Sequence, residues 1–216
     1  MNLTPYTLNL SCIPYPFPAS QEGLFIQQII DAIRTEKVFI FPTESFYGLG
    51  GNALSQQVVE RVGKLKNRPD NKAFPILVSD CQMLESLVED IPDVARKLMN
   101  RHWPGPLTII FSARQGLPAG TVSPEQKIAV RISSHPFLRL LSKKLSLPLI
   151  ATSANLSSAP AAKSWTELDR KLLQKVDFCV DGGDCPPGLA STLIDITVSP
   201  PKVIRSGDIS LEQEQS

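Results

Sequence analysis

Two short polar clusters interrupt otherwise apolar stretches of the chain, and their residue types suit an anionic ligand. Lys66-Asn67-Arg68 lies in a basic segment that runs from Arg61 to Lys72, and Ser153-Ala154-Asn155 follows an apolar run. Fixed cations together with small hydrogen-bond donors are what a phosphate-bearing ligand requires. The two clusters therefore predict a site for a nucleotide or for RNA.

Further polar residues stand at or near the ends of expected strands. Thr43, Glu44 and Ser45 leave an apolar strand and are followed by three closely spaced glycines. Ligands in open α/β sheets bind beyond the carboxyl ends of strands, and glycine allows a close approach of the backbone. Arg131 lies within an apolar strand, where a cation is costly unless it is solvated or paired. It could face water on an edge strand, or it could clamp a carboxylate.

Each of these features also has a purely structural explanation. The cations around Lys66 can complement the dipole of a helix that ends there, and Ser153 with Asn155 can form an ordinary turn after a strand. The segment 42–50 can be a plain strand-to-loop corner. In favour of a site, Lys66 and Arg68 flank a helix end, so their charges can converge on one ligand. Alternation along an extended chain would also turn Ser153 and Asn155 to the same face.

Hydrophobic periodicity and capping signals predict the elements that must position these residues. Helices are expected over 21–36 with Ser20 as the cap, over 55–66, 80–89, 92–102 and 136–145, and over 164–176 after a Ser164–Glu167 capping box. Strands are expected over 38–41, 74–78, 107–111, 128–132, 149–152, 178–180, 192–196 and 202–204. Because helices and strands alternate only in part, we predict an α/β (α+β) fold with a mixed, twisted sheet and flanking helices.

The composition narrows the possible functions. The chain has 216 residues, 42% of them hydrophobic, and its 22 basic and 21 acidic residues give a net charge of +1. Any positive field that attracts nucleic acid must therefore be local. The four cysteines contain no CxxC pair and, with two histidines, offer no recognisable zinc site. Neither GxGxxG nor GxxxxGK[ST] occurs, so ATP would have to bind without a Rossmann fingerprint or a P-loop.

The expected location and domain organisation are simple. No apolar run reaches the ~18 residues of a membrane span, and the first twenty residues contain no cation. Together with unpaired thiols, this favours a cytoplasmic protein. We expect one catalytic domain over 20–207, an N-terminal extension over 1–19 and a frayed polar tail over 208–216.

Six motifs, in order along the chain, resemble the YrdC-like family and most closely its threonylcarbamoyl-AMP synthase members. They are Pro42-Thr-Glu-Ser-Phe-Tyr-Gly-Leu-Gly50, Lys66-x-Arg68-Pro69, Trp103-Pro-Gly-Pro-Leu-Thr108, Val130-Arg131, Ser153-Ala-Asn155 and Ser191-Thr192. The match runs from about residue 20 to 207 and is to the short, single-domain form that lacks a C-terminal extension. The resemblance implies a YrdC-like sheet with a concave, locally basic ligand cleft.

The resemblance also implies a reaction. L-threonine, bicarbonate and ATP would give threonylcarbamoyl-adenylate and pyrophosphate, and a transferase complex would pass the threonylcarbamoyl group to an adenosine beside the anticodon of tRNA. Positioning and fixed cations would carry this chemistry without a nucleophilic residue. Mg²⁺ is expected with ATP, although no protein ligand for it is evident. Direct contact with tRNA or double-stranded RNA stays open.

Catalytic and ATP-binding roles follow from the matched motifs. Lys66 and Arg68 match the family's Lys-x-Arg, which contacts the triphosphate and the carbamate or threonine. Ser153 and Asn155 match its Ser-x-Asn, near the phosphates. These residues are the candidates for catalysis. Arg205 matches a nucleotide-binding arginine.

The resemblance also supplies the candidates for binding L-threonine. Thr43, Arg131 and Ser191 match threonine-binding positions, and Arg131 is the natural partner of a carboxylate. Arg68 would contribute here as well. Lys72 matches a frequent lysine after the motif arginine, which is a further candidate for ATP.

The chain departs from the family pattern at a few positions, and other functions stay open. Ser45, Phe46 and Ser158 stand where threonine, valine and glycine are more common, which could alter the pocket wall and a loop. One alternative is an RNA-binding or ribosome-associated module that uses the basic segment 64–72. Another is a related carbamoyl-adenylating maturation enzyme.

Overall fold

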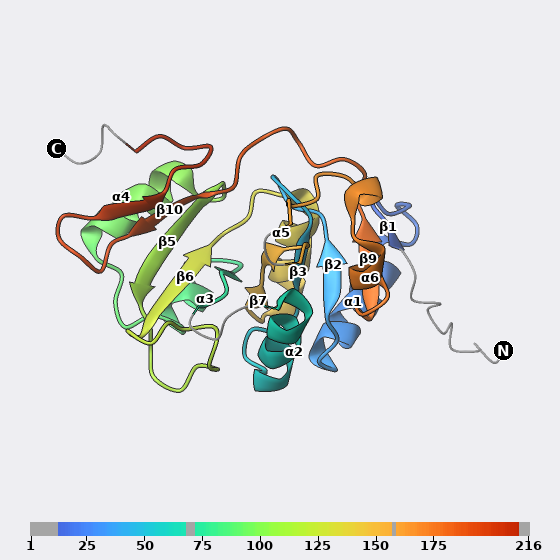
Figure 1. The fold of residues 1–216 in the computed structure, drawn as a ribbon, viewed down its shortest axis with the longest axis horizontal. Coiled ribbons are helices and arrows are strands. Elements are labelled where there is room, and N and C mark those ends of the chain that lie inside the picture. Colours follow the sequence, from blue (N-terminus) through green and yellow to red (C-terminus); the bar gives the residue numbers. More distant parts are fainter. Residues whose placement is uncertain (1–12, 68–71, 157–158, 212–216) are drawn as a thin grey trace.

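Two sheets lie side by side along the long axis of the molecule (Figure 1). The computed structural model describes residues 13–67, 72–156 and 159–211. These residues form a five-stranded sheet of order β1-β9-β2-β3-β8 and a six-stranded sheet of order β11-β10-β5-β6-β4-β7. The predicted α/β fold with mixed strands and flanking helices is confirmed, but two sheets replace the single sheet that we expected.

The strands of both sheets are short, and most were predicted. The five-stranded sheet contains β1 (Ile13–Pro14), β9 (Phe178–Asp181), β2 (Phe39–Phe41), β3 (Gly48–Gly50) and β8 (Thr152–Ser153). The six-stranded sheet contains β11 (Lys202–Arg205), β10 (Thr192–Asp195), β5 (Leu107–Ser112), β6 (Lys127–Arg131), β4 (Ile76–Leu77) and β7 (Leu149–Ile150). Between β7 and β8 the chain passes at Ala151 from the second sheet into the first, and the Ala151 amide donates to the Pro75 carbonyl at 2.9 Å. Ser153 therefore lies where the two sheets meet.

The helices cover the sheets and complete two hydrophobic clusters. They are α1 (Glu22–Arg34), α2 (Gln56–Lys66), α3 (Cys81–Glu85), α4 (Asp93–His102), α5 (Pro136–Leu145) and α6 (Arg170–Leu173), with a 3₁₀ turn at Trp165–Glu167. The apolar faces of α1 and α5 share one cluster with the aromatic side chains of β2 and β9. The apolar faces of α2 and α4 belong to a larger cluster that includes β5 and β6. Because the strands are short, both sheets are held together mainly by the packing of apolar side chains.

Two of the predicted helix caps are wrong. Helix α1 begins at Glu22 after Gln21, and no side chain caps it, so Ser20 has no capping role. The Ser164–Glu167 box does not form either, because Ser164 Oγ pairs with Thr166 Oγ1 at 2.9 Å and Glu167 Oε2 accepts from the Lys163 amide at 2.7 Å. The long helix expected there is broken, and Asp169 caps the short α6 instead by accepting from the Lys171 amide.

The segment after β11 also differs from the frayed tail expected from residue 208. Leu211 is buried, and Thr192 Oγ1 accepts from the Ile209 amide at 3.1 Å while donating to the Ile209 carbonyl at 2.6 Å. Because this segment is short and mostly polar, we did not predict that its two apolar side chains, Ile209 and Leu211, pack on the core. Residues 212–216 lie outside the described residues, as do residues 1–12 of the expected N-terminal extension.

The glycine-rich segment after β2 forms a strand where we expected a loop. Gly48–Gly50 pairs antiparallel with β2 on one side and β8 on the other. A Cβ on Gly50 would lie 1.7 Å from the carbonyl oxygen of Ile150, so only glycine lets the two chains approach this closely. None of the helices in the described residues is both long and apolar enough to cross a membrane.

We predict opposite effects of alanine at two glycines. Gly50→Ala should lower the free energy of unfolding by about 3 kcal/mol or more, because the methyl group collides with backbone that cannot move aside. Gly63→Ala, in helix α2 with open space around its Cα, should raise it by about 0.5–1 kcal/mol. Urea unfolding of both variants checks this, and equal midpoints would contradict the close approach at Gly50.

Candidate active site

A cavity of about 340 Å³ opens between the two sheets. The loop after β2, with Thr43 and Ser45, and Ser153 of β8 form the wall on the side of the five-stranded sheet. The facing wall carries Arg131 from β6, Thr108 from β5, Ser191 from the segment before β10, and Arg205 from β11. Most of these residues end a strand or follow one, so the polar side chains meet at the seam between the sheets.

Lys66 ties helix α2 to the strand beside this cavity. The helix forms because Ser55 caps it by accepting from the Val58 amide at 3.2 Å, and it stops at Asn67, which adopts a left-handed φ of 49°. Lys66, its last residue, is only 4% exposed. Its Nζ donates to the Ser153 carbonyl and to Asn155 Oδ1, each at 2.6 Å. The charge is therefore held against polar oxygens instead of projecting into solvent.

Ser153 and Asn155 face the same way, as alternation predicted, but they bond to each other. Ser153 Oγ donates to Asn155 Oδ1 at 2.6 Å, and the Asn155 amide nitrogen donates to the Ala159 carbonyl. Both side-chain donors are thus engaged within the protein. A phosphate that used the Ser153 hydroxyl would have to take over its hydrogen from Asn155.

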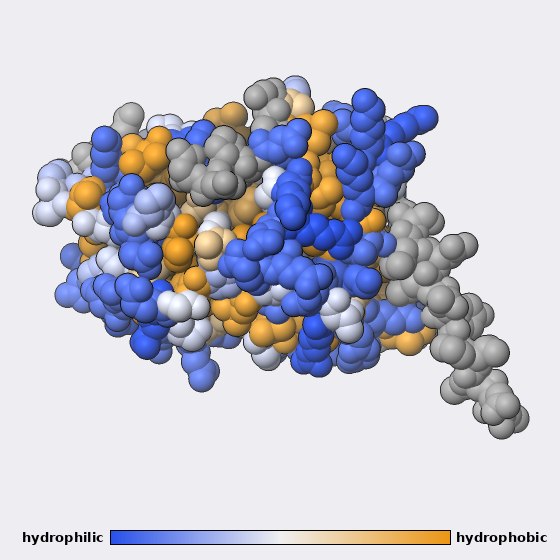
Figure 2. All heavy atoms as spheres, turned by 60° about the horizontal axis from the view of Figure 1, so that its bottom comes forward, coloured by the Kyte–Doolittle hydropathy of each residue, from blue (hydrophilic) through white to orange (hydrophobic). Residues whose placement is uncertain are grey.

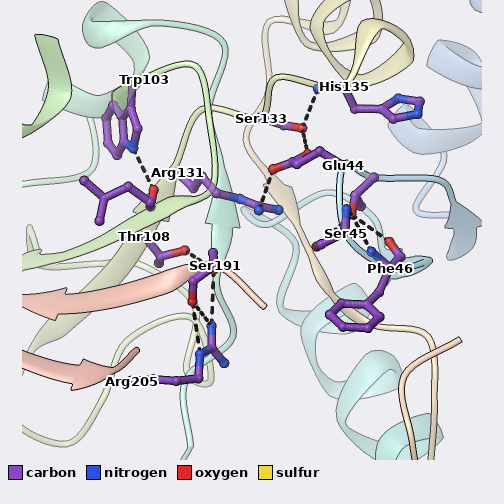
Figure 3. Close-up of polar contacts among 12 residues, drawn as sticks. Glu44, Ser45, Phe46, Trp103, Thr108, Arg131, Ser133, His135, Ser191 and Arg205 are labelled. Carbon is purple, nitrogen blue, oxygen red and sulfur yellow. Dashed lines mark hydrogen bonds and ion pairs between the residues drawn. The ribbon is translucent and has the colours of Figure 1, made fainter. Parts of the chain in front are cut away.

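Arg131 reaches across the seam to a carboxylate on the other sheet. Its Nη1 lies 2.6 Å from Glu44 Oε1, and both side chains are largely buried. Figure 3 shows Ser133 on the other side of this carboxylate, where its hydroxyl donates to Glu44 Oε2, and His135 beyond it. Strand β6 has neighbours on both sides, so the edge-strand explanation for Arg131 is wrong. The arginine is tolerated because it is paired.

Arg205 and Ser191 form a second polar group on the same wall (Figure 3). Arg205 donates from Nε and Nη2 to the Ser191 carbonyl at 3.1 and 2.8 Å, and from Nη2 to Ser191 Oγ at 3.2 Å. Ser191 Oγ also lies 2.8 Å from Thr108 Oγ1. Desolvation, and to a lesser extent the charge of Arg131, lowers the pKa of Arg205. The two guanidinium groups are close enough to repel each other, which favours an anion between them.

Thr43 lines the cavity, but its hydroxyl closes a turn. Thr43 Oγ1 donates to the Phe46 carbonyl at 2.6 Å and accepts from the amides of Ser45 and Phe46 at 3.2 Å. This turn fixes the direction in which Glu44 leaves the strand. The following Tyr47 is fully buried and donates to the Gly183 carbonyl at 2.7 Å, and burial raises its pKa. The loop is therefore rigidly held at both ends.

The structure brings most of the predicted site residues together. Thr43, Arg131, Ser153, Ser191 and Arg205 all line the cavity. Lys66 and Asn155 do not line it: Lys66 donates to the Ser153 carbonyl from helix α2, and Asn155 lines a second hollow of about 490 Å³.

The two remaining predicted residues are not placed at the cavity either. Lys72 is exposed and lines a different hollow, of about 450 Å³, together with Lys64 and Asn67 of the α2 terminus. Arg68 lies outside the described residues, and so does Ser158.

Sequence reasoning assigned no role to Glu44, Thr108 or Ser133. Glu44 was visible as a polar residue at the strand exit, and Thr108 ends the Trp103–Thr108 motif. Glu44 and Arg131 are 87 positions apart along the chain, Thr108 and Ser191 are 83 apart, and Ser133 and Glu44 are 89 apart. Nothing local marks such pairings. Among the described residues, no three histidine, cysteine or acidic side chains cluster as metal ligands would.

Known proteins with this sequence pattern and fold were found. Residues 31–207 match the model of the Sua5/YciO/YrdC family, which carries the description "Telomere recombination". The threonylcarbamoyl-AMP synthase of Pyrococcus abyssi is 35% identical over 181 residues, which cover 84% of this chain and 53% of that protein. The chain thus spans about half the length of this relative.

Solved structures agree with the family match. P. abyssi Sua5 complexed with L-threonine superposes with a TM-score of 0.84 at 31% identity, covering 94% of this chain and 59% of that one. E. coli YciO superposes with a TM-score of 0.80 at 26% identity, covering 93% of this chain and 96% of that one. The sequence match and these superpositions span both sheets and the cavity between them, and the chain belongs to the Sua5/YciO/YrdC family.

Proposed function

We propose that the protein makes L-threonylcarbamoyl-adenylate and pyrophosphate from L-threonine, bicarbonate and ATP, and is thus a nucleotidyltransferase. The observation that carries the proposal is the cavity between the sheets, where Arg131, Arg205 and Ser191 face Ser153 with Lys66 behind it. One small space thus offers two guanidinium groups and several hydroxyl groups to a ligand. Relatives named for this activity, and a Sua5 structure with bound L-threonine, support it.

The reaction needs two anions to be held against each other. The amine of threonine combines with CO2 derived from bicarbonate to form a carbamate, with loss of water. A carbamate oxygen then attacks the α-phosphorus of ATP, and pyrophosphate leaves with the electron pair of the broken P–O bond. No protein nucleophile takes part, so alignment and charge stabilisation must lower the barrier.

The residues of the cavity have separate tasks in this proposal. Arg131 binds the carboxylate of threonine, with Ser191 and the Thr43 turn shaping the same subsite. Ser153, Asn155 and Lys66, together with Arg68, hold the phosphates, and Arg205 holds the nucleotide. Charge-assisted hydrogen bonds of this kind are about twice as strong as neutral ones. Lys72 lines a different hollow, so it is the weaker candidate for contact with ATP.

Mg²⁺ would enter with ATP. In the described residues the carboxylate beside the cavity, Glu44, is engaged by Arg131 and Ser133, so the donor set suits a cation carried by the phosphates and water. We propose that the product is handed, in the cytoplasm, to a tRNA threonylcarbamoyl-transferase complex. Figure 2 shows hydrophilic and apolar side chains interspersed on one face of the molecule, and the net charge of +1 favours a ligand site over an extended RNA surface.

The reaction itself can be tested with the purified chain. Pyrophosphate release should require ATP, L-threonine and bicarbonate together, because the carbamate is the attacking group. Pyrophosphate is measured by a coupled phosphate assay, with each substrate omitted in turn. Release that is indifferent to threonine would refute the proposal, and RNA affinity with a steep salt dependence but no adenylate would favour the RNA-binding alternative.

We predict that Lys66→Met lowers turnover by about 100-fold or more, because the buried charge that supports the phosphate subsite is lost while the side-chain volume is kept. Lys64→Met is the matched control: it lies on the same helix and is exposed. Its turnover should change by less than about twofold. Steady-state rates and thermal melts of both variants check this. Equal rates for the two variants, or a K66M rate that falls only as far as its folded fraction, would contradict a role in the site.

Arg131→Ala should raise the KM for threonine by about 10- to 100-fold, which corresponds to the loss of a hydrogen-bonded carboxylate contact. The KM for ATP should stay within about threefold of the wild-type value. Titrations of each substrate at saturating levels of the other separate the two constants. An unchanged threonine KM would contradict the assignment of Arg131 to the carboxylate of threonine.

A further inference from the structure

The Arg131–Glu44 ion pair joins the two walls of the cavity. Arg131 comes from β6 of the six-stranded sheet, and Glu44 follows β2 of the five-stranded sheet. We propose that Glu44 is a positioning residue, which sets the direction of the Arg131 guanidinium for the carboxylate of an α-amino acid. This inference rests on the function proposed above.

Glu44 contacts Arg131 from outside the cavity. Arg131 lines the cavity, whereas Glu44 does not. The side chains of Arg131 and Glu44 are 9% and 12% exposed, so water screens the pair only weakly. In the described part of the chain Glu44 is the charged partner of Arg131. Most of the five N–H donors of the guanidinium therefore remain for a ligand in the cavity.

The carboxylate is itself held in place. Its second oxygen, Oε2, accepts from Ser133 Oγ, and Ser133 Oγ accepts in turn from the His135 amide at 3.2 Å. On the near side, the turn closed by Thr43 fixes the backbone at Ser45 and Phe46. A carboxylate fixed from two directions can impose one orientation on its partner, which a mobile surface carboxylate cannot do.

Charge explains why this restraint is needed. The guanidinium of Arg205 is bound to Ser191 on the same wall, close enough for the charge of Arg131 to act on it. The two cations repel each other, and Glu44 offsets this repulsion by its attraction for Arg131, so that without Glu44 the Arg131 guanidinium would turn away from its neighbour. With Glu44 behind it, Arg131 stays beside Arg205, and both present positive charge to the same small volume.

The test is a kinetic comparison of Glu44→Ala, Glu44→Gln and wild-type protein in the pyrophosphate assay. We expect Glu44→Ala to raise the threonine KM by about 100-fold, because a misdirected guanidinium loses its contact with the substrate. Glu44→Gln keeps an acceptor for Arg131 and should raise the threonine KM by about 10-fold only. The ATP KM should stay within about threefold in both variants. If the alanine variant does not fold, the glutamine variant carries the test.

Asp195→Asn is the matched control. Asp195 is a buried carboxylate in the same sheet as Arg131, paired with Lys127 at 2.8 Å, and it does not line the cavity. Its substitution should leave both KM values unchanged, even if the melting temperature falls. This separates loss of a buried ion pair in general from loss of this particular pair.

A double-mutant cycle gives the sharpest outcome. If Glu44 acts through Arg131, then Glu44→Ala should add less than about threefold to the threonine KM in an Arg131→Ala background. The inference would be overturned if the effects of the two substitutions on the threonine KM multiplied, if the threonine KM of Glu44→Ala stayed at the wild-type value, or if both KM values rose equally. Each of these outcomes would leave the proposed function in place. A wild-type protein without threonine-dependent turnover would overturn both.

Discussion

A cation on one sheet and a carboxylate on the other meet where water is largely excluded, and the cavity depends on that contact. Separating Arg131 from Glu44 would leave a buried charge unpaired, at a cost of about 3–5 kcal/mol, although the pair contributes little net stability compared with apolar side chains. Its effect is therefore geometric. It joins two sheets made of short strands, and it leaves a guanidinium group at the space between them.

A second buried cation joins helix α2 to the strand beside the cavity. The ammonium of Lys66 is held between the Ser153 carbonyl and the Asn155 side chain, so the end of α2 cannot move independently of β8. Asn155 Oδ1 accepts from both Lys66 and Ser153, which leaves its amide to donate to the Ala159 carbonyl. These polar groups already bond to one another, so a ligand would have to replace an internal hydrogen bond instead of binding a group that has no partner.

Local signals predicted those elements whose own residues decide them. Helix α5 has the predicted bounds because Pro136 opens it and its leucines repeat on one face, and α2 was predicted to within one residue by its valines. Ser164 failed as a cap since Glu167 binds the neighbouring Lys163 amide instead. Strand β3 was missed because glycine has a low strand propensity; the Ile150 carbonyl requires glycine at position 50, and the Phe41 ring crowds position 48.

The sequence by itself determined which residue types would gather at a site: cations at a helix end, small hydroxyl and amide side chains at strand ends, and the family motifs that link them. It also indicated that Arg131 needed either water or a charged partner, since a cation inside a sheet is costly without one of them. Only the tertiary structure decided that this partner is Glu44, that Lys66 is buried against Ser153, and that Lys72 faces another hollow. The reason is distance along the chain. Pairings across more than eighty residues depend on how two sheets meet, and no periodicity or capping rule in one segment carries that information.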